Sequence, residues 1–394
     1  MQRNRPIYLD NQATTPCDPR VVAAMLPYFT ESFGNPHSIE HALGREAETA
    51  VAQARAEVAA LIGASPREIV FTSGATESNN LAIKGAARFA ARQENPRRRL
   101  ITLATEHKCV LEATRDLAEE GFEPVFLPVQ PDGRLDPEAL HAALATPTLL
   151  VSVMAANNET GVLQDITALA ALAHAAGALF HTDAAQAAGK IPLDVVAQGI
   201  DLLSISGHKL YGPKGVGALY VRHRPRARLA PLLSGGGQER GLRSGTLPAP
   251  LIVGFGAACR IARAEMAAEA VRLAGLRERL LARLQDAIPG IAVNGSREHR
   301  LAGNLNLAFP GARAETLLAD LPDLCLSTGS ACSSAAIEPS YVLRAMGIAP
   351  ESAARSLRIG IGRFTSATDI DIAADLLIAA HARNSERQSE PQNA

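Results

Sequence analysis

Tryptophan is absent from this chain of 394 residues, and aromatic side chains make up only 4% of it. Cysteine is also scarce: the chain has Cys17, Cys109, Cys259, Cys325 and Cys332, an odd number, and no two of them form a C-x-x-C pair. Disulfide scaffolds and structural zinc sites depend on paired cysteines at short spacing. The cysteine content therefore indicates neither a disulfide framework nor a structural metal site.

The chain also lacks a long apolar run and a strong charge of either sign. No segment approaches the roughly 20 apolar residues that a membrane-spanning helix needs. The net charge of -1 gives no electrostatic basis for nucleic acid or an anionic membrane as the main partner. The first residues lead directly into Ile7-Tyr8-Leu9-Asp10 without the apolar core of a signal peptide. We therefore expect a cytoplasmic protein.

What the chain does contain is a long alternation of strand-like and helix-like segments. Its hydrophobic content of 47% supports a sizeable core, and its length favours two domains. Short apolar runs predict strands at 69–71, 99–103, 124–127, 149–154, 178–181, 202–205 and 217–221. Helical spacing of apolar residues predicts helices at 46–62, 111–120 and 166–176. This alternation is typical of an α/β fold with a mostly parallel sheet covered by helices.

The pattern changes after about residue 251. A long helix rich in alanine, glutamate and arginine is predicted to reach about residue 287, and shorter strands and helices follow it. We predict a large α/β domain over residues 16–255 and a smaller α+β domain formed by residues 1–15 and 256–383. The polar residues 384–394 are expected to be a disordered tail.

A lysine ends one of the predicted strands, in the segment from Ser204 to Lys209. A neutral lysine amine can form an imine with a carbonyl, and burial or nearby cations favour that neutral form. Pyridoxal 5'-phosphate (PLP) is the cofactor that needs such a lysine, together with an acid for its ring nitrogen and donors for its phosphate. Most lysines are simply exposed, so the interpretation depends on the neighbouring strand ends.

Those strand ends carry the other groups that PLP requires. In open α/β sheets a ligand binds beyond the carboxyl ends of the strands. Residues 72–78 join a strand to a helix and predict an anion site at the helix N-terminus. Asp183 could keep the ring nitrogen protonated. Gln186 and Asn158 could hydrogen-bond the ring oxygen and the substrate, and His107 could stack on the ring. Each feature alone is common, but their placement on successive strand ends indicates one site.

Cys332 lies among small residues in the segment STGSACSSA at 327–335. Such a segment is unsuited to core packing and is typical of an exposed loop. A thiol in that setting can act as a nucleophile when its thiolate is favoured. Cys17, Cys109 and Cys259 have apolar neighbours and are expected to be small buried side chains, and Cys325 is expected inside a strand.

Taken together, the segments resemble the cysteine desulfurases of the IscS/NifS type, which belong to the class V aminotransferase branch of fold-type I PLP enzymes. The resemblance extends over nearly the whole chain, and the combination of motifs is specific although each one is weak. The motifs are YLD at 8–10, ATTP at 13–16, FGNP at 33–36, EIVFTSGATES at 68–78, EHK at 106–108, NNE at 157–159, SGHK at 206–209, GGQERG at 236–241, RSGT at 243–246, GSACSS at 329–334, EPSYVLR at 338–344 and Arg358.

The resemblance implies how the cofactor would be held in the large domain. Lys209 would bond covalently to PLP, Asp183 would pair with its ring nitrogen, and His107 would stack over the ring and assist proton transfer. Gln186 and Asn158 would contact the ring-oxygen side. The phosphate would be bound by a set of backbone, hydroxyl and imidazole groups: Ala75, Thr76, Ser206, His208 and, from the second subunit of a homodimer, Thr246.

The resemblance also implies the substrate and the reaction. Asn158 and Arg358 would bind L-cysteine, with Arg358 taking its carboxylate through paired hydrogen bonds. Cys332, on a loop of the small domain, would accept the sulfur as a persulfide, and L-alanine would be released. The sulfur would then pass to an acceptor protein for iron–sulfur cluster assembly or tRNA thiolation. Cys332 could also ligate an iron–sulfur cluster transiently, and no other metal site is expected.

Several alternatives share part of this pattern. A selenocysteine lyase or an aminotransferase of class V would have the same PLP site, although an aminotransferase needs no exposed loop cysteine such as Cys332. A non-catalytic binding protein on this fold is expected to have lost Lys209 or Asp183. A nucleotide-binding protein is disfavoured because no glycine-rich dinucleotide motif follows a strand.

Overall fold

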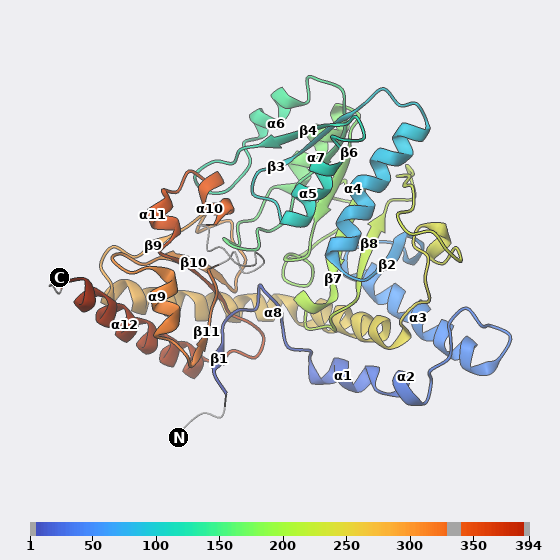
Figure 1. The fold of residues 1–394 in the computed structure, drawn as a ribbon. Helices are drawn as coiled ribbons and strands as arrows, with labels where there is room; N and C mark the ends of the chain where they lie inside the picture. Colours follow the sequence, from blue (N-terminus) through green and yellow to red (C-terminus); the bar gives the residue numbers. More distant parts are fainter. Residues whose placement is uncertain (1–4, 329–339, 390–394) are drawn as a thin grey trace.

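A seven-stranded sheet forms the centre of the molecule in the computed structural model, which describes residues 5–328 and 340–389 (Figure 1). The strand order is β2-β8-β7-β6-β5-β3-β4, in which β8 is antiparallel to both of its neighbours and the other pairs are parallel. The mostly parallel α/β sheet predicted from the sequence is thus confirmed. The strands are β2 (Ile69–Thr72), β3 (Arg99–Leu103), β4 (Glu123–Leu127), β5 (Thr148–Ser152), β6 (Leu179–Asp183), β7 (Leu202–Ser206) and β8 (Gly217–Val221).

Helices cover both faces of this sheet because its strands bury side chains on both sides. Successive residues of a strand point to opposite faces, so Leu100 and Leu202 pack into one core while Ile101 and Leu203 pack into the other. Helices α4 (Ala75–Arg92) and α5 (Lys108–Asp116) cover the first face. The second is covered by α1 (Pro19–Met25), α3 (Ala42–Leu61), α6 (Pro137–Ala143), α7 (Ile166–Ala175) and the first part of α8 (Ala249–Ala287), while α2 (Pro27–Thr30) connects α1 to α3.

A second, smaller apolar core is built around a three-stranded antiparallel sheet. Its strand order is β12-β10-β9, and a parallel pair, β1 with β11, lies beside it. Side chains such as Leu280 and Leu284 from the second part of α8 pack into this core. The elements are β1 (Ile7–Tyr8), β9 (Ala292–Val293), β10 (Asn304–Ala308), β11 (Leu324–Cys325), β12 (Ser356–Gly360), α9 (Ala314–Ala319), α10 (Tyr341–Ala345), α11 (Pro350–Ala353) and α12 (Ala367–Ser389).

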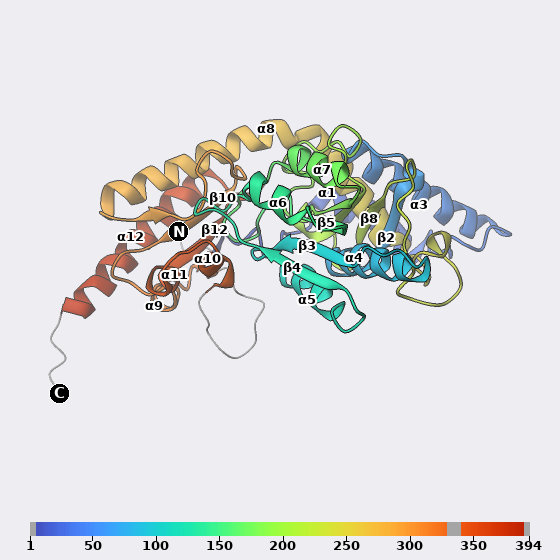
Figure 2. The same ribbon diagram turned by 90° about the horizontal axis from the view of Figure 1, so that it is seen from above.

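Helix α8 runs along both cores, as Figures 1 and 2 show. Ile252 and Phe255 near its start belong to the large core, whereas Leu280 and Leu284 near its end belong to the small one. The domain boundary predicted at residue 255 therefore falls inside a continuous helix rather than in a linker, and the division into two domains stays a prediction. The predicted long helix to about residue 287 is confirmed.

The C-terminal expectation was wrong in part, because α12 continues to Ser389. Asn384, which is only 3% exposed, donates to a side-chain oxygen of Asp320 over 2.9 Å. Arg387 forms an ion pair with the same carboxylate. These polar residues are ordered by a partner distant in the sequence, which composition alone does not reveal. Within the described residues, no helix has the length and apolar character needed to cross a bilayer.

Candidate active site

A cavity of about 550 Å³ opens where β2, β5, β6 and β7 end. Its wall also includes residues from the N-terminal segment and Arg358 from β12. The structure brings ten of the twelve predicted site residues to this cavity: Ala75, Thr76, His107, Asn158, Asp183, Gln186, Ser206, His208, Lys209 and Arg358. Thr246 is exposed and does not line it, and Cys332 lies outside the described residues.

Lys209 projects from a single 3₁₀ turn, Gly207–Lys209, that follows β7 directly. Its Nζ donates to the backbone carbonyls of Gln12 (2.5 Å) and Ala13 (2.8 Å). These acceptors come from the N-terminal segment, almost 200 residues away in sequence. The amine is therefore held at the cavity wall by two neutral backbone acceptors.

Asp183, at the end of β6, is a buried acidic group of the cavity and is only 4% exposed. Its Oδ2 accepts from the Asn79 side chain (2.7 Å), and its Oδ1 accepts from the backbone N–H of Ala185 (2.9 Å). Donors therefore fix both oxygens of this side chain in place. A buried carboxylate held in this way can keep a neighbouring ring nitrogen protonated.

His107 caps helix α5 and lines the cavity beside Cys109. Its Nδ1 accepts from the backbone N–H of Cys109 (3.2 Å) and lies 3.0 Å from the Cys109 thiol. Burial lowers the pKa of His107, and the charges of Lys209 and Lys108 add to this effect while Asp183 opposes it. A neutral imidazole whose Nδ1 is an acceptor carries its proton on Nε2.

Cys109 differs from its sequence-based interpretation as a core residue. The side chain is half-buried and lines the cavity. Burial raises the pKa of its thiol to about 12, with a further contribution from Asp183. The thiol is therefore protonated at neutral pH and is a poor nucleophile. Cys259 is buried and Cys325 lies in β11, as expected, while Cys17 is half-buried.

One end of the cavity is suited to a phosphate. Helix α4 begins after Gly74, which has a φ of 152° and offers no capping side chain to the first N–H groups of the helix. A side chain at Gly217 would come within 2.7 Å of the Gly74 Cα, so the strand and the loop can pack closely only without one. Free N–H groups and the helix dipole attract anions. Ser206 and His208 face the same cavity.

His208 is neutral in this environment. Burial lowers its pKa to about 4, and the positive charges of Lys209, Lys214 and Lys190 act in the same direction. Its Nδ1 lies 3.0 Å from the hydroxyl of Thr14. A bound dianion would reverse this electrostatic balance, because an opposite charge favours the protonated imidazole.

Arg358 is a buried guanidinium in the cavity wall. It lies on β12, is 3% exposed, and pairs through Nη2 with Asp10 (2.9 Å) while Nη1 donates to the backbone carbonyl of Asn158 (3.0 Å). Its Nε has no hydrogen-bond partner among the described residues. Asp10 also accepts from the hydroxyl of Ser327 (3.0 Å), which lies five residues before Cys332 in the sequence. The guanidinium is thus fixed in the cavity wall, and it still has an N–H group to donate to a ligand.

Two amide side chains complete the wall. Gln186 donates through Nε2 to the carbonyl of Gln12 (2.8 Å), and its Oε1 accepts from Lys190 (3.0 Å). The Oδ1 of Asn158 is buried and has no partner among the described residues. Buried polar atoms are normally satisfied, so this oxygen is suited to a ligand.

Sequence reasoning missed the residues that approach the site from other parts of the chain. Asp10, Gln12 and Ala13 belong to the N-terminal segment, and Asn79 lies on the inner face of α4. Each of them contacts a residue that lies more than 100 positions away in the sequence. The YLD and ATTP motifs around the first three were the available signal, but nothing in them specified Arg358 or Lys209 as partners.

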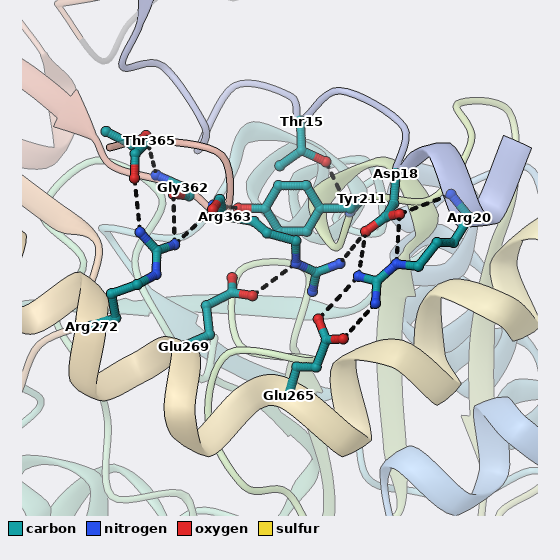
Figure 3. A network of polar contacts seen from close by, with 10 residues as sticks. All are labelled: Thr15, Asp18, Arg20, Tyr211, Glu265, Glu269, Arg272, Gly362, Arg363 and Thr365. Atoms are coloured by element: carbon teal, nitrogen blue, oxygen red, sulfur yellow. Dashed lines mark hydrogen bonds and ion pairs between the residues drawn. The ribbon is translucent and has the colours of Figure 1, made fainter. Parts of the chain in front are cut away.

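A polar network joins the Lys209 turn to the segment after Arg358 (Figure 3). The backbone N–H of Arg363 donates to the hydroxyl of Tyr211 (2.5 Å), and its guanidinium lies 4.3 Å from the centre of the Tyr211 ring. Arg363 also pairs with Asp18 (2.9 Å) and with Glu269 on α8 (2.8 Å). The network therefore connects the N-terminal segment, the large core and the small core close to the cavity.

The cavity fits PLP by the chemistry of its donor set. It offers an amine, a buried acid, a helix N-terminus for a phosphate and an unpaired amide oxygen, all within a volume typical of small-ligand sites. Among the described residues, no three His, Cys, Asp or Glu side chains are grouped to hold a metal ion.

Comparisons with known proteins agree with the enzyme family that the sequence motifs resemble. The family model for aminotransferase class V matches residues 7–372. A cysteine desulfurase IscS of Rickettsia felis is 54% identical over 95% of this chain and 90% of that protein. A mitochondrial cysteine desulfurase of Arthroderma benhamiae is 57% identical over 93% of this chain and 73% of that protein.

Solved structures agree with the sequence relatives. A NifS-like protein superimposes with a TM-score of 0.89 at 36% identity, covering 96% of this chain and 100% of that one. A structure described as SspA in complex with cysteine gives a TM-score of 0.79 at 36% identity, over 91% and 99% of the two chains. The chain belongs to the class V aminotransferase family. Within that family it is one of the cysteine desulfurases.

Proposed function

We propose that this enzyme uses PLP to convert L-cysteine into L-alanine and transfers the sulfur to Cys332. In the overall reaction the C–S bond of the substrate breaks, an S–S bond forms on the enzyme thiol, and a proton replaces sulfur on the substrate carbon. The observation that carries the proposal is the single cavity shared by Lys209, Asp183 and Arg358. These three groups supply the amine, the acid and the carboxylate-binding cation that the reaction needs.

The cofactor would be held by the residues that face each of its functional groups. Lys209 would bond to its aldehyde carbon, Asp183 would pair with its ring nitrogen, and Gln186 with Asn158 would contact its ring-oxygen side. Its phosphate would lie at the start of α4, against Ala75, Thr76, Ser206 and His208. When bound, PLP supplies an electron sink for the carbanion formed at the substrate α-carbon.

The chain's own groups orient the substrate and move its protons. Arg358 would bind the carboxylate, because a guanidinium offers paired donors of matching geometry. The amine of Lys209, once released by the substrate amine, would take the α-proton. His107 would assist proton transfer, since its lowered pKa keeps it neutral near pH 7.

Cys332 would act as the nucleophile toward the substrate sulfur. Support comes from described residues that precede and follow Cys332 in the sequence. Ser327 is bonded to Asp10, the partner of Arg358, and Ser340 donates to Glu159 over 2.5 Å. Both anchors lie next to residues of the cavity wall, Arg358 and Asn158.

A homodimer would complete each site through Thr246 of the second subunit. Thr246 is exposed and lies outside the cavity of its own chain. Large apolar side chains are exposed along α1, α2 and the segment leading to α3, and buried interfaces are the usual place for such side chains. They are Leu26 (59% exposed), Phe29 (56%), Phe33 (63%) and Ile39 (58%).

The persulfide on Cys332 would be passed to a second protein for iron–sulfur cluster assembly or tRNA thiolation. An iron–sulfur scaffold is one such acceptor, and during transfer Cys332 could ligate the growing cluster. A persulfide needs an acceptor thiol or reductant, so the enzyme turns over only when one is present.

The test is to assay alanine and sulfide formed from L-cysteine by the purified protein in the presence of a thiol reductant, and to record its absorption spectrum. We expect a yellow protein and equal amounts of the two products. Lys209→Ala should abolish turnover, whereas the surface variant Lys84→Ala should behave as wild type. Full activity of Lys209→Ala would refute the proposal, and activity with L-selenocysteine but not L-cysteine would identify a selenocysteine lyase.

A further inference from the structure

Lys190, on the loop after β6, is part of a hydrogen-bonded chain that ends at Lys209. Its Nζ donates to the Oε1 of Gln186 (3.0 Å), and the Nε2 of Gln186 donates to the Gln12 carbonyl (2.8 Å). The same carbonyl accepts from Lys209 (2.5 Å). The chain thus runs from Lys190 through two residues of the cavity wall to the reactive amine, although Lys190 itself does not line the cavity.

Both partners of the Gln186 side chain require the same orientation of its amide. Lys190 offers donors to its oxygen, and the Gln12 carbonyl can only accept from its nitrogen. The amide is therefore fixed with Oε1 bound to Lys190, which does not line the cavity. Nε2 carries a second N–H, and this hydrogen is available to a ligand in the cavity that Gln186 lines.

The environment of Lys190 maintains this arrangement over a wide pH range. Burial lowers the pKa of Lys190 to about 7, and the charges of Lys209 and Arg358 act in the same direction while Glu269 opposes them. An ammonium and a neutral amine both have N–H groups to donate, so the bond to Gln186 survives the titration. Lys190 and Glu269 also line a separate cavity of about 30 Å³, large enough for one water molecule.

We propose that Lys190 is a positioning residue that holds the Gln186 amide so that its N–H, and not its carbonyl, faces the ring oxygen of PLP. The inference rests on the proposed function, because it concerns the cofactor of that reaction. With PLP bound, a donor at the ring oxygen would disperse the negative charge of that oxygen and would weaken its hold on the proton of the nitrogen joined to Lys209. Lys190 therefore sets, through Gln186, the pH at which that proton is lost.

The test is a pH titration of the absorption band of the PLP-loaded protein, which changes when this proton leaves. Gln186→Leu should raise the midpoint by about one pH unit, the size expected for losing a hydrogen bond to a charged group. Lys190→Met should raise it in the same direction. The double variant should titrate like Gln186→Leu alone, because Lys190 acts only through that side chain.

Lys190→Gln separates the hydrogen bond from the charge, since it keeps a donor without an ammonium, and it also provides a second variant if Lys190→Met fails to fold. The proposal is supported if Lys190→Gln titrates with the same midpoint as the wild-type protein. Two results would overturn it in favour of a charge effect. In the first, Lys190→Gln shifts the midpoint as far as is expected for Lys190→Met. In the second, the shift of the double variant equals the sum of the shifts of Lys190→Met and Gln186→Leu. A wild-type protein that binds no PLP would instead contradict the proposed function.

Discussion

At the scale of single residues, Glu106 shows how a buried carboxyl is accommodated next to the site. It is fully buried, its Oε1 accepts from the backbone N–H of Met154 (2.6 Å), and its Oε2 has no partner among the described residues. Burial raises the pKa of Glu106 well above its usual range, and the charge of Asp183 adds to this. The folded protein therefore favours the protonated form of this side chain more than an unfolded chain does.

This predicts a pH-dependent cost to stability. Because the folded pKa lies above the unfolded one, stability should fall as pH rises from about 4.5 toward the folded pKa. Glu106→Gln mimics the protonated form and should remove that decline. Chemical denaturation at pH 5 and pH 8 measures this decline. Relative to wild type, the unfolding free energy of the variant should be higher at pH 8 than at pH 5. An equal difference at both values would show that Glu106 is ionised in the fold.

A second residue-scale prediction concerns Arg358 and the substrate. Lysine keeps the charge but loses the planar pair of donors, so Arg358→Lys should raise KM for L-cysteine about tenfold or more while kcat changes less. Arg92→Lys, on the exposed end of α4, is the matched control and should leave both constants unchanged. An unaltered KM for Arg358→Lys would remove Arg358 from the carboxylate site.

The site was more predictable from sequence at some residues than at others. Asp183 and Lys209 follow apolar strands directly, so the rule that ligands bind beyond strand ends brings them together. Cys109 was misassigned because apolar neighbours in sequence say nothing of its position beside the His107 cap. Asp10 could not be paired with Arg358, because that contact spans 348 residues.

At the scale of elements, the network of Figure 3 fixes the N-terminal segment and the β12 end relative to the Lys209 turn. The side chain of Asp18 is 2% exposed and accepts from both Arg363 and Arg20. The hydrogen bond from Arg20 leads in holding the pKa of Asp18 well below its usual range, although burial opposes this. Helix α8 contributes Glu265 and Glu269 to the same cluster.

Asp18→Asn should reveal the ionic part of this network, because asparagine can still cap α1. We expect a loss of about 3 kcal/mol of unfolding free energy at pH 7, typical of breaking a buried pair. Since the folded pKa of Asp18 lies below the unfolded one, its contribution is present above pH 3.8 and disappears as pH falls below it. Asp116→Asn removes an exposed pair with Lys84 and should cost at most about 1 kcal/mol.

The ends of helices were harder to predict from sequence than their centres, because they depend on contacts outside the helix. The periodic core of α3 and the whole of α8 were predicted, since their apolar spacing is long and regular. Helix α5 begins at Lys108, three residues before its predicted start, because His107 caps it with a side-chain hydrogen bond. The last turns of α12 were missed because their order depends on Asp320.

At the scale of the whole molecule, the proposed homodimer shares its sites between subunits. A mixture of Lys209→Ala and Thr246→Asp subunits should form hybrid dimers in which one site contains neither change. Each hybrid should then have about half the activity of a wild-type dimer, while each parent is inactive. Tagged hybrids isolated by two affinity steps provide the measurement. Inactive hybrids would show that Thr246 does not serve the partner's phosphate site.

In the proposed reaction sulfur moves from L-cysteine to Cys332, and mass spectrometry of the protein after one turnover locates the transferred sulfur. With L-cysteine in stoichiometric amount and no reductant, we predict one additional sulfur atom on the peptide that contains Cys332 and one alanine released per persulfide. Cys332→Ala should carry no added sulfur and release little alanine. Sulfur mapped instead to Cys109 or Cys325, or alanine formed at the normal rate by Cys332→Ala, would show that Cys332 is not the sulfur acceptor.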